Sequence, residues 1–330
     1  MTTLAVLVVL ELLLLTYIVT RILRAQVAPN PTLRAAILTS IALFVGMLSV
    51  TEPVEVILRG PGGMTVGAPT MLKHLAILGC AAGVLLMAMA QRALYRPKAE
   101  LAVWASFLAT AVPMLILHVI AGGGGLLNSV DYVEWSHSQP LLLAGMLIAY
   151  LGGLVACFGF FAVIWPLRLG TASGRGLAIM AVGAVFLAGW CVFRLNYLWE
   201  AATATTPPTD SQFLVTQVLS VMGMLLLTVG LLWSTAEADL AALKYWMRFR
   251  VLSARVLEVL PEVRRTSDWR LGLDTWVLDR AVEVLDGLHQ IDRVTVGPTG
   301  FPQPPECVSD VEIPAVVAKL GRTYQGKVRV

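Results

Sequence analysis

Apolar runs long enough to cross a bilayer as helices recur along this chain, with polar segments between them. Each run has roughly eighteen to twenty-five residues, about the length that a transmembrane helix needs. The pattern predicts an all-α, polytopic membrane protein with seven transmembrane helices. The predicted spans are Thr3–Thr20, Ala35–Val50, Met71–Gln91, Leu101–Ile120, Pro140–Trp165, Gly176–Leu198 and Phe213–Trp233.

Basic residues fall almost entirely on alternate loops between these spans. Because cytoplasmic loops carry the excess of Lys and Arg, we expect the N-terminus outside and the C-terminus inside the cell, in the plasma membrane. The basic loops hold Arg21, Arg24 and Arg34, then Arg92, Arg96 and Lys98, then Arg168 and Arg175. The opposite loops are mainly acidic, with Glu52, Glu55, Asp131, Glu134, Glu200 and Asp210 against Arg59 and Lys73.

The chain divides by composition near Ser234. Residues 1–234 are membrane-like, whereas Thr235–Val330 contains thirteen basic and thirteen acidic residues. We therefore expect a seven-helix transmembrane domain followed by a small cytoplasmic helical domain, 235–330. The net charge of the whole chain is +3, which loop asymmetry explains, and we expect no nucleic-acid partner.

The first part of the tail, Ala238–Leu260, has the composition of a helix with aromatic and basic residues. It either lies along the inner leaflet, where basic groups attract anionic lipid, or continues the seventh span.

A second tail helix is predicted by a single apolar stripe at steps of three and four residues, which must be covered. The helix before it is one possible cover and a second copy of the protein is the other. The stripe consists of Leu273, Val277, Ala281, Val284, Leu288 and Ile291. The Gly- and Pro-rich segment 297–305 is predicted to be a linker, with a short helix around 311–320.

Ionisable residues inside predicted spans are candidates for function, because burying them in hydrocarbon is costly. Glu11 lies near the centre of the first span, as a neutral hydrogen-bonded group or as part of a ligand or proton pathway. Arg194 lies about one turn below the outer end of the sixth span, near Glu200. Its guanidinium either snorkels outward or faces inward and holds an anionic group.

Three histidines fall on the predicted outer side: His74, His118 and His137. Together with Asp131 and Glu134 they could form a pH sensor or a metal site, but no pair has the close spacing that specifies a metal. We expect ordinary interfacial histidines, no metal and no cofactor.

Small residues at four-residue steps indicate where helix backbones approach closely. They are Gly79 and Gly83, then Gly145, Ala149 and Gly153, then Ala184 and Ala188. Pro113 removes one helical hydrogen bond from the fourth span, and we expect a kink there.

Several classes of protein are excluded or disfavoured. There is no P-loop for a nucleotide, and the last span has no lysine to form the retinal Schiff base of a rhodopsin. No nucleophile and base recur at catalytic spacing, so no enzymatic activity is predicted.

The tail carries motifs that resemble an uncharacterised actinobacterial family of seven-helix membrane proteins, commonly described as transporters. The similar positions are Trp246, then Pro261, Glu262 and Val263, then Leu278, Arg280, Glu283, Asp286, Gly287 and Leu288. The last set has the form L-x-R-x-x-E-x-x-D-G-L on a helix. The resemblance implies an actinomycete plasma membrane and little about mechanism.

Arg280, Glu283 and Asp286 could form a polar face for a cytoplasmic partner protein, or a solvated face with local helical pairing. Gly287 inside a helical pattern predicts a close backbone contact.

Two functions follow as hypotheses. The first is a receptor-like or relay protein, in which an outer pocket with Glu11, His74, His118, Arg194 and Glu200 senses a small molecule and the tail signals to a cytoplasmic regulator. The second is a secondary transporter of a small solute. A homo-oligomer is compatible with both.

Overall fold

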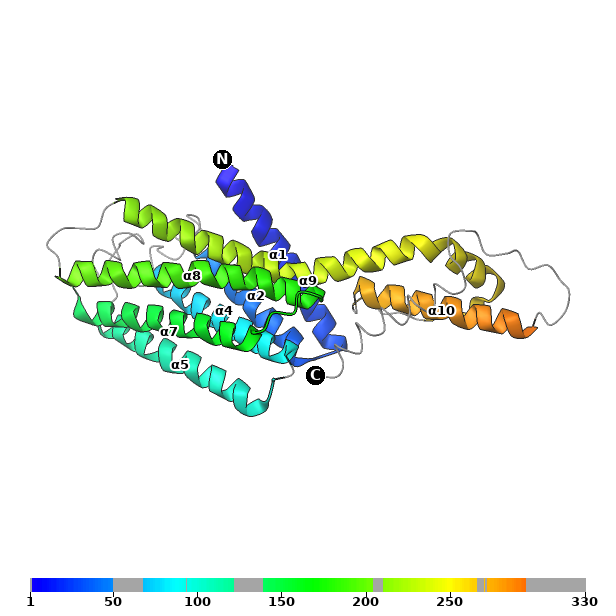
Figure 1. Cartoon of the computed structure of the whole chain (residues 1–330), viewed down its shortest axis with the longest axis horizontal. Helices are drawn as coiled ribbons and strands as arrows, with labels where there is room; N and C mark the ends of the chain where they lie inside the picture. Colours follow the sequence, from blue (N-terminus) through cyan, green and yellow to red (C-terminus); the bar gives the residue numbers. More distant parts are fainter. Residues whose placement is uncertain are drawn as a thin grey trace, which may run out of the picture. The chain divides into compact units, whose positions relative to one another are not determined.

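The chain folds into α-helices throughout the part that the structure describes, and no strand occurs in that part. The computed structural model describes residues 2–49, 68–92, 94–121, 139–203, 210–265, 270 and 272–294. The helices are α1 (Thr2–Val27), α2 (Pro31–Leu48), α4 (Ala68–Gln91), α5 (Pro97–Ile120), α7 (Pro140–Ile164), α8 (Ala172–Thr203), α9 (Asp210–Val259), the 3-10 helix η1 (Pro261–Val263) and α10 (Leu273–Val294) (Figure 1). The all-α prediction is confirmed for these residues.

Each predicted span corresponds to one of these helices, although α2 ends at Leu48 and α7 at Ile164, just before the predicted ends Val50 and Trp165. Six helices in the described residues are long and apolar enough to cross a membrane, which makes the chain a multi-pass membrane protein. They are Pro31–Leu48, Thr70–Gln91, Pro97–Ile120, Pro140–Ile164, Ala172–Glu200 and Leu214–Glu258. The remaining predicted span, Thr3–Thr20, lies on α1, and its passage through the membrane stays a prediction, as does the orientation of the chain.

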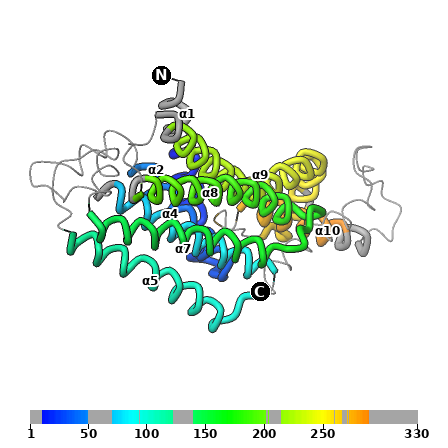
Figure 2. Tube along the Cα trace, turned by 60° about the vertical axis from the view of Figure 1, so that its left-hand side comes forward, coloured from blue at the N-terminus to red at the C-terminus, as the bar shows by residue number. Residues whose placement is uncertain are grey.

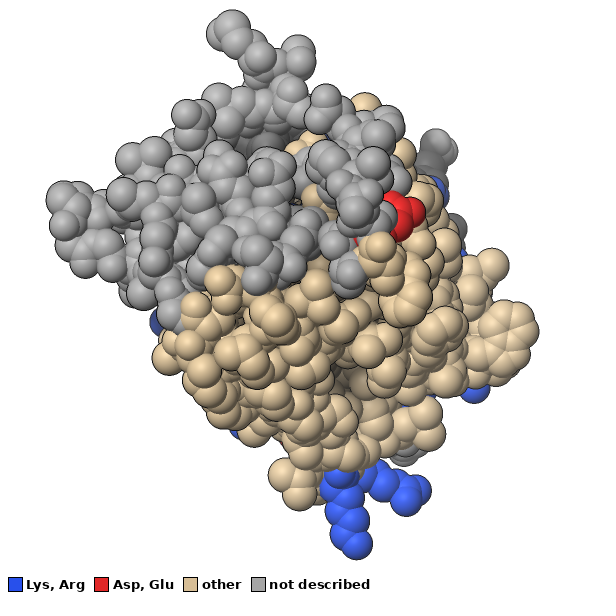
Figure 3. Space-filling model, turned by 90° about the vertical axis from the view of Figure 1, so that its left-hand side faces the viewer, with Lys and Arg blue, Asp and Glu red and all other residues tan. Residues whose placement is uncertain are grey.

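The surface of the bundle is apolar as well as its core. Leu101, Val155 and Phe158 are 69, 72 and 67% exposed on α5 and α7. Tan side chains dominate the described part of the face in Figure 3, and basic side chains project from its lower edge. Such a surface suits hydrocarbon better than water, because a large exposed apolar area is costly in water.

Two compact units are distinguished by their internal contacts. Unit 1 comprises Met1–Ile22 and Pro31–Trp233, and unit 2 comprises Leu23–Asn30 and Ser234–Val330. Both α1 and α9 are continuous helices that belong partly to each unit.

Unit 1 is a bundle in which α4 and α7 are central. The helix α4 packs on α2, α5 and α7, while α7 also packs on α5 and α8 (Figure 2). Pro97 and Pro140 are the first residues of α5 and α7, where the backbone N–H that proline lacks would have no partner within the helix. Pro113 lies inside α5, and the helix continues beyond it to Ile120.

Glycines set the closest approaches between helices. A Cβ on Gly83 of α4 would lie 3.0 Å from the Thr39 backbone nitrogen of α2, as the predicted small-residue row implies. A tighter contact between α8 and α9 was not predicted. A Cβ on Gly183 would lie 3.0 Å from the Gly223 carbonyl oxygen, and one on Gly230 would lie 2.7 Å from the Gly176 carbonyl oxygen.

Unit 2 is built around a helical hairpin of α9 and α10. Phe249, Leu252 and Val256 of α9 pack on Val277, Ala281 and Val284 of α10. The preceding helix therefore covers the apolar stripe of α10 from Leu273 to Leu288, and it was the first of the two predicted covers. The predicted tail helix 238–260 is the continuation of the seventh span, because α9 is unbroken from Asp210 to Val259.

The predicted contact at Gly287 is also present, since a Cβ there would collide with the Val256 side chain. The predicted linker 297–305 and the short helix around 311–320 lie outside the described residues, as do Glu52, Glu55, Asp131, Glu134 and His137.

Candidate functional site

A cluster of aromatic and basic side chains lies in unit 1, where the first turns of α4 meet the middle of α7 and the later turns of α8. His74, Tyr150 and Trp190 form its buried centre, with exposed fractions of 8, 2 and 3%. Lys73 and Arg194 add two positive charges. We call these five residues the polar cluster.

Hydrogen bonds fix the imidazole of His74. Its Nδ1 lies 2.7 Å from the Thr70 carbonyl oxygen, and its Nε2 lies 3.2 Å from the Tyr150 hydroxyl. A carbonyl oxygen only accepts, so Nδ1 carries the hydrogen. In the neutral ring Nε2 then accepts, and the Tyr150 O–H donates to it. His74 and Tyr150 thus hold each other in place across α4 and α7.

The indole of Trp190 contacts both of these side chains. Its ring centroid lies 5.1 Å from that of Tyr150, at an interplanar angle of 86°, and 6.3 Å from that of His74. The edge-to-face geometry with Tyr150 is a favourable arrangement of ring quadrupoles. The Trp190 Nε1 donor is buried, and no described residue accepts a hydrogen bond from it.

Each cation of the cluster lies near an aromatic face. Lys73 Nζ is 5.9 Å from the Trp190 ring centroid, and Arg194 Cζ is 5.8 Å from that of Tyr197. No carboxylate among the described residues forms a salt bridge with Lys73. The cluster is therefore rich in positive charge and in hydrogen-bond donors.

His74 also lines a small cavity with His118 of α5. The cavity has a volume of about 10 Å³, close to the minimum for one water molecule, and Met114, Gly145 and Met146 form part of its wall. The structure thus places His74, which the sequence singled out, beside His118 in the wall of this cavity.

Two further residues that the sequence singled out are Glu11 and Glu200. Glu11 lies on α1, and its buried Oε1 accepts no hydrogen bond from a described residue. Glu200, near the end of α8, accepts a hydrogen bond of 2.8 Å from Asn196 Nδ2. Their roles in a ligand pathway stay predictions.

The sequence analysis missed Lys73, Tyr150 and Trp190. A signal existed for one of them, because Trp190 precedes Arg194 by four residues and therefore shares its face of the sixth span. Lys73 was counted with the basic residues of the outer loops although it falls within the predicted span Met71–Gln91, and it lies in the second turn of α4. Nothing in the sequence places Tyr150 next to His74.

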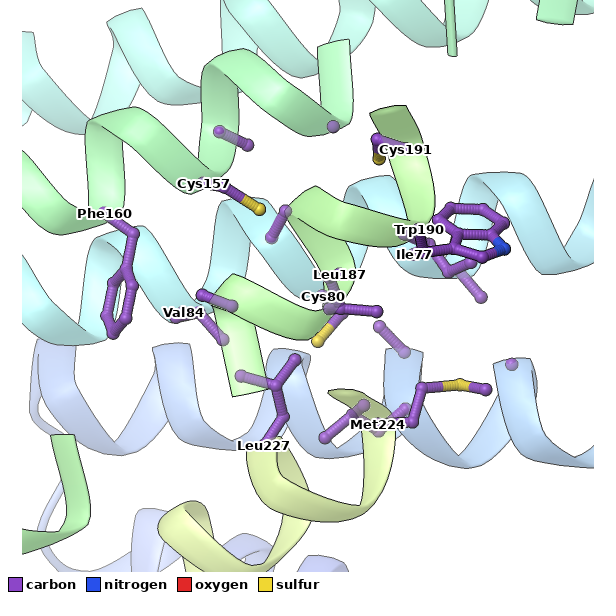
Figure 4. A pocket seen from close by; sticks show the side chains of 18 residues that line it. Ile77, Cys80, Val84, Cys157, Phe160, Leu187, Trp190, Cys191, Met224 and Leu227 are labelled. Carbon is purple, nitrogen blue, oxygen red and sulfur yellow. The ribbon is translucent and has the colours of Figure 1, made fainter. Parts of the chain in front are cut away.

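A larger cavity of about 50 Å³ lies deeper in the bundle, between α2, α4, α7, α8 and the first half of α9 (Figure 4). Its wall is almost wholly apolar and includes Cys80, Cys157 and Cys191. Trp190 is at its edge, with the indole nitrogen pointing away from the other labelled side chains. This cavity offers no charge or hydrogen bond that would orient a polar ligand.

The proposed partner face of unit 2 is organised around Glu283. This carboxylate is 0% exposed, and Arg280 Nη1 donates to both of its oxygens, at 2.8 and 2.6 Å. The Arg265 backbone N–H donates to Oε1 at 2.5 Å. The Glu283 contacts are thus internal to unit 2. Asp286 is half-exposed and pairs with the Arg265 guanidinium at 2.9 Å. Binding of a partner by this face stays a prediction.

One further ion pair joins α1 to α10 within unit 2. Arg24 Nη1 lies 3.6 Å from Asp274 Oδ1, and both side chains are largely buried, at 14 and 11% exposure. Gly272, just before α10, has a φ of 99° and lies close to the Arg24 guanidinium. A larger residue there would be strained and would press on Arg24.

No three His, Cys, Asp or Glu side chains in the described part of the chain are grouped to hold a metal ion. No family model matches this chain, and comparisons with curated proteins and with solved structures give no match. The resemblance to an actinobacterial family accordingly stays a prediction.

Proposed function

We propose that this multi-pass membrane protein is a receptor of the plasma membrane that binds a small organic anion at the polar cluster and passes the bound state to unit 2. The observation that carries the proposal is the half-buried Lys73, which forms no salt bridge with a described carboxylate, beside the buried Trp190 N–H, which donates to no described residue. A cluster of donors and cations is best completed by an acceptor with negative charge.

The aromatic walls favour an anion that also has an apolar part. Tyr150 and Trp190 present ring surface next to the cations, so a carboxylate attached to a small ring or chain would gain both contacts. In the state observed, Lys73 lies over the indole of Trp190. An arriving carboxylate would draw Lys73 away from that ring face, which gives ligand binding a conformational consequence.

The route to the cytoplasm in this proposal is through the two shared helices. Both α1 and α9 begin in unit 1 and end in unit 2, and Arg24 near the end of α1 pairs with Asp274 at the start of α10. A rearrangement of the bundle that shifts either helix would therefore reach the hairpin. A cytoplasmic regulatory protein would recognise the changed hairpin.

Ligand binding is tested with the purified full chain in detergent, with benzoate as the probe anion and benzamide as its neutral counterpart. We expect benzoate, and not benzamide, to raise the thermal unfolding temperature and to change tryptophan fluorescence, because only the anion completes the charge. Lys73→Gln and Arg194→Gln should abolish both effects. Lys98→Gln, at an exposed position at the start of α5, should preserve them.

The proposal is wrong if benzoate and benzamide act alike, or if the benzoate effect survives in Lys73→Gln. Uptake of labelled benzoate into sealed vesicles then separates the receptor from the secondary transporter. A receptor gives no uptake above protein-free vesicles. Uptake that Glu11→Gln or Arg194→Ala abolishes, at equal protein levels, would favour transport instead.

A further inference from the structure

The part of α9 that belongs to unit 2 has two apolar faces, and only one of them is covered by α10. Phe249, Leu252 and Val256 form the covered face. The other face consists of Ala236, Leu240, Leu243, Met247, Val251 and Ala254, and we call it the outer stripe. Its four large members, Leu240, Leu243, Met247 and Val251, are 67, 40, 56 and 45% exposed.

The outer stripe is straight and lies opposite α10. With about 100° per residue, its six members fall within a sector of about 80°, whose centre is about 180° from the covered face. From Ala236 to Ala254 the stripe extends about 27 Å along the helix. Its steps of four, three, four, four and three residues are those of helices that pack side by side over several turns.

We propose that the outer stripe binds the same stripe of a second copy of this chain, so that two α9 helices run parallel about a two-fold axis. Copies inserted in one membrane with the same orientation present α9 in parallel, and one surface can then cover itself. A lipid surface is a poorer match, because it would meet the whole stripe only if α9 lay flat on it, whereas α9 is one unbroken helix from Asp210 to Val259 that includes the seventh predicted span.

The charges beside the outer stripe favour this parallel arrangement. Asp239 lies on one flank of the stripe and Lys244 on the other. In a parallel pair, the Asp239 flank of one helix faces the Lys244 flank of the other. The residues that meet there differ by five in number, which brings Asp239 towards the partner's Lys244. An antiparallel pair would set the flank with Lys244, Arg248 and Arg255 against its own copy, where like charges repel.

The contact would also leave the hairpin intact. Because α10 lies on the opposite side of α9, a second copy can reach the outer stripe without displacing Val277 or Val284 from the covered face. The inference does not depend on the ligand proposed for the polar cluster.

Cross-linking of the full chain in native membranes tests the proposal. In a Cys307→Ser background, Met247→Cys lies on the stripe and should form a disulfide-linked dimer when a mild oxidant is added. Ala241→Cys is also at an exposed position but lies about 120° away on the same helix, and it should stay monomeric. The background without an added cysteine should give no dimer.

A second experiment disrupts the proposed interface by substitution and measures the mass of the particle. In mild detergent we expect the wild-type protein to have the mass of a dimer, and Leu240→Glu combined with Met247→Glu to halve it. Both changes lie on exposed positions, and unchanged tryptophan fluorescence would show that the hairpin is folded. Equal cross-linking of Met247→Cys and Ala241→Cys, or a monomeric wild-type protein, would overturn the proposal.

Discussion

Single residues in unit 2 show how one buried charge organises a small helical unit. Glu283 is wholly buried, and its neutralising partner Arg280 is itself only 12% exposed in its side chain. The guanidinium also lies 5.5 Å from the Trp276 ring centroid. Removing the carboxylate would leave Arg280 and the Arg265 N–H without their acceptor in a site that water reaches poorly.

We therefore expect Glu283→Ala to destabilise unit 2 strongly, by about 3–5 kcal/mol. Trp246 and Trp276 lie 4.7 Å apart between their ring centroids, so the fluorescence of the full chain should report the unfolding of the hairpin.

Asp286→Asn is the matched control, because the Arg265 and Asp286 side chains are about half exposed. An exposed ion pair is worth about 1 kcal/mol or less. Equal losses of stability in the two variants would show that the buried carboxylate of Glu283 does not hold unit 2 together.

The titration of Asp279 makes the stability of unit 2 depend on pH. Burial raises the pKa of its carboxyl above the ordinary value of 3.8, and nearby Glu283 raises it further, against the opposing effects of Arg265 and Arg280. The folded state thus binds the proton more tightly than the unfolded state. Its contribution to stability is greatest below pH 3.8 and is lost as the pH rises through the raised pKa of the folded state.

Asp279→Asn should accordingly raise the unfolding temperature of the hairpin at pH 7, relative to wild type, and should give little gain at pH 3.5. Fluorescence melts of the full chain at the two pH values measure the difference. A gain of the same size at both pH values would mean that the titration of Asp279 is not its cause.

The sequence predicted one ion pair of this region, but not the burial of its carboxylate. The spacing of Arg280, Glu283 and Asp286 predicted a polar face, and the pair Arg280–Glu283 is present. The burial of Glu283 could not be predicted, because it lies beside the apolar stripe and is enclosed by the chain that returns after η1. Whether Glu283 is buried depends on the path of the chain around Arg265 in the folded protein.

At the scale of helices, the packing of α8 on α9 depends on glycine. A Cβ on Gly230 would lie 2.7 Å from the Gly176 carbonyl oxygen and 2.8 Å from the Met180 nitrogen. Backbone atoms cannot move away as a flexible side chain can. Both helices would have to separate to accommodate even one methyl group.

We expect Gly230→Ala to lower the stability of the bundle by about 1–3 kcal/mol, the usual cost of overpacking. Thermal aggregation of the purified chain in detergent measures the loss. Gly170→Ala is the control, since a Cβ at Gly170 meets no atom within 4 Å. If the two variants unfold at the same temperature, the close contact of α8 and α9 does not contribute to stability.

The helices themselves could be predicted because hydrocarbon demands long, uninterrupted apolar runs. Their partners could be predicted only in part. The four-residue spacing of Gly79 and Gly83 correctly predicted a close helix contact at Gly83. The glycines at the contact of α8 and α9 are spaced by seven residues instead, Gly176 with Gly183 and Gly223 with Gly230. A seven-residue step also returns to the same helix face, so this signal was present in the sequence.

For the whole molecule, the receptor proposal requires the polar cluster and unit 2 to lie on opposite sides of the membrane. The cluster lies near the ends of α4 and α8 that were predicted to face outward from the distribution of Lys and Arg. The fold alone gives no orientation, because an inverted bundle would have the same internal contacts. The charge asymmetry of the loops is the physical argument for N-out and C-in.

Labelling of single cysteines in intact cells with a membrane-impermeant maleimide tests this arrangement most directly. In the Cys307→Ser background, Thr203→Cys marks the end of α8 and Arg264→Cys marks the turn between α9 and α10, and both positions are exposed. We expect Thr203→Cys to be labelled in intact cells, and Arg264→Cys only after the membrane is permeabilised. Labelling of Arg264→Cys in intact cells would contradict the proposed passage of a signal from outside to unit 2.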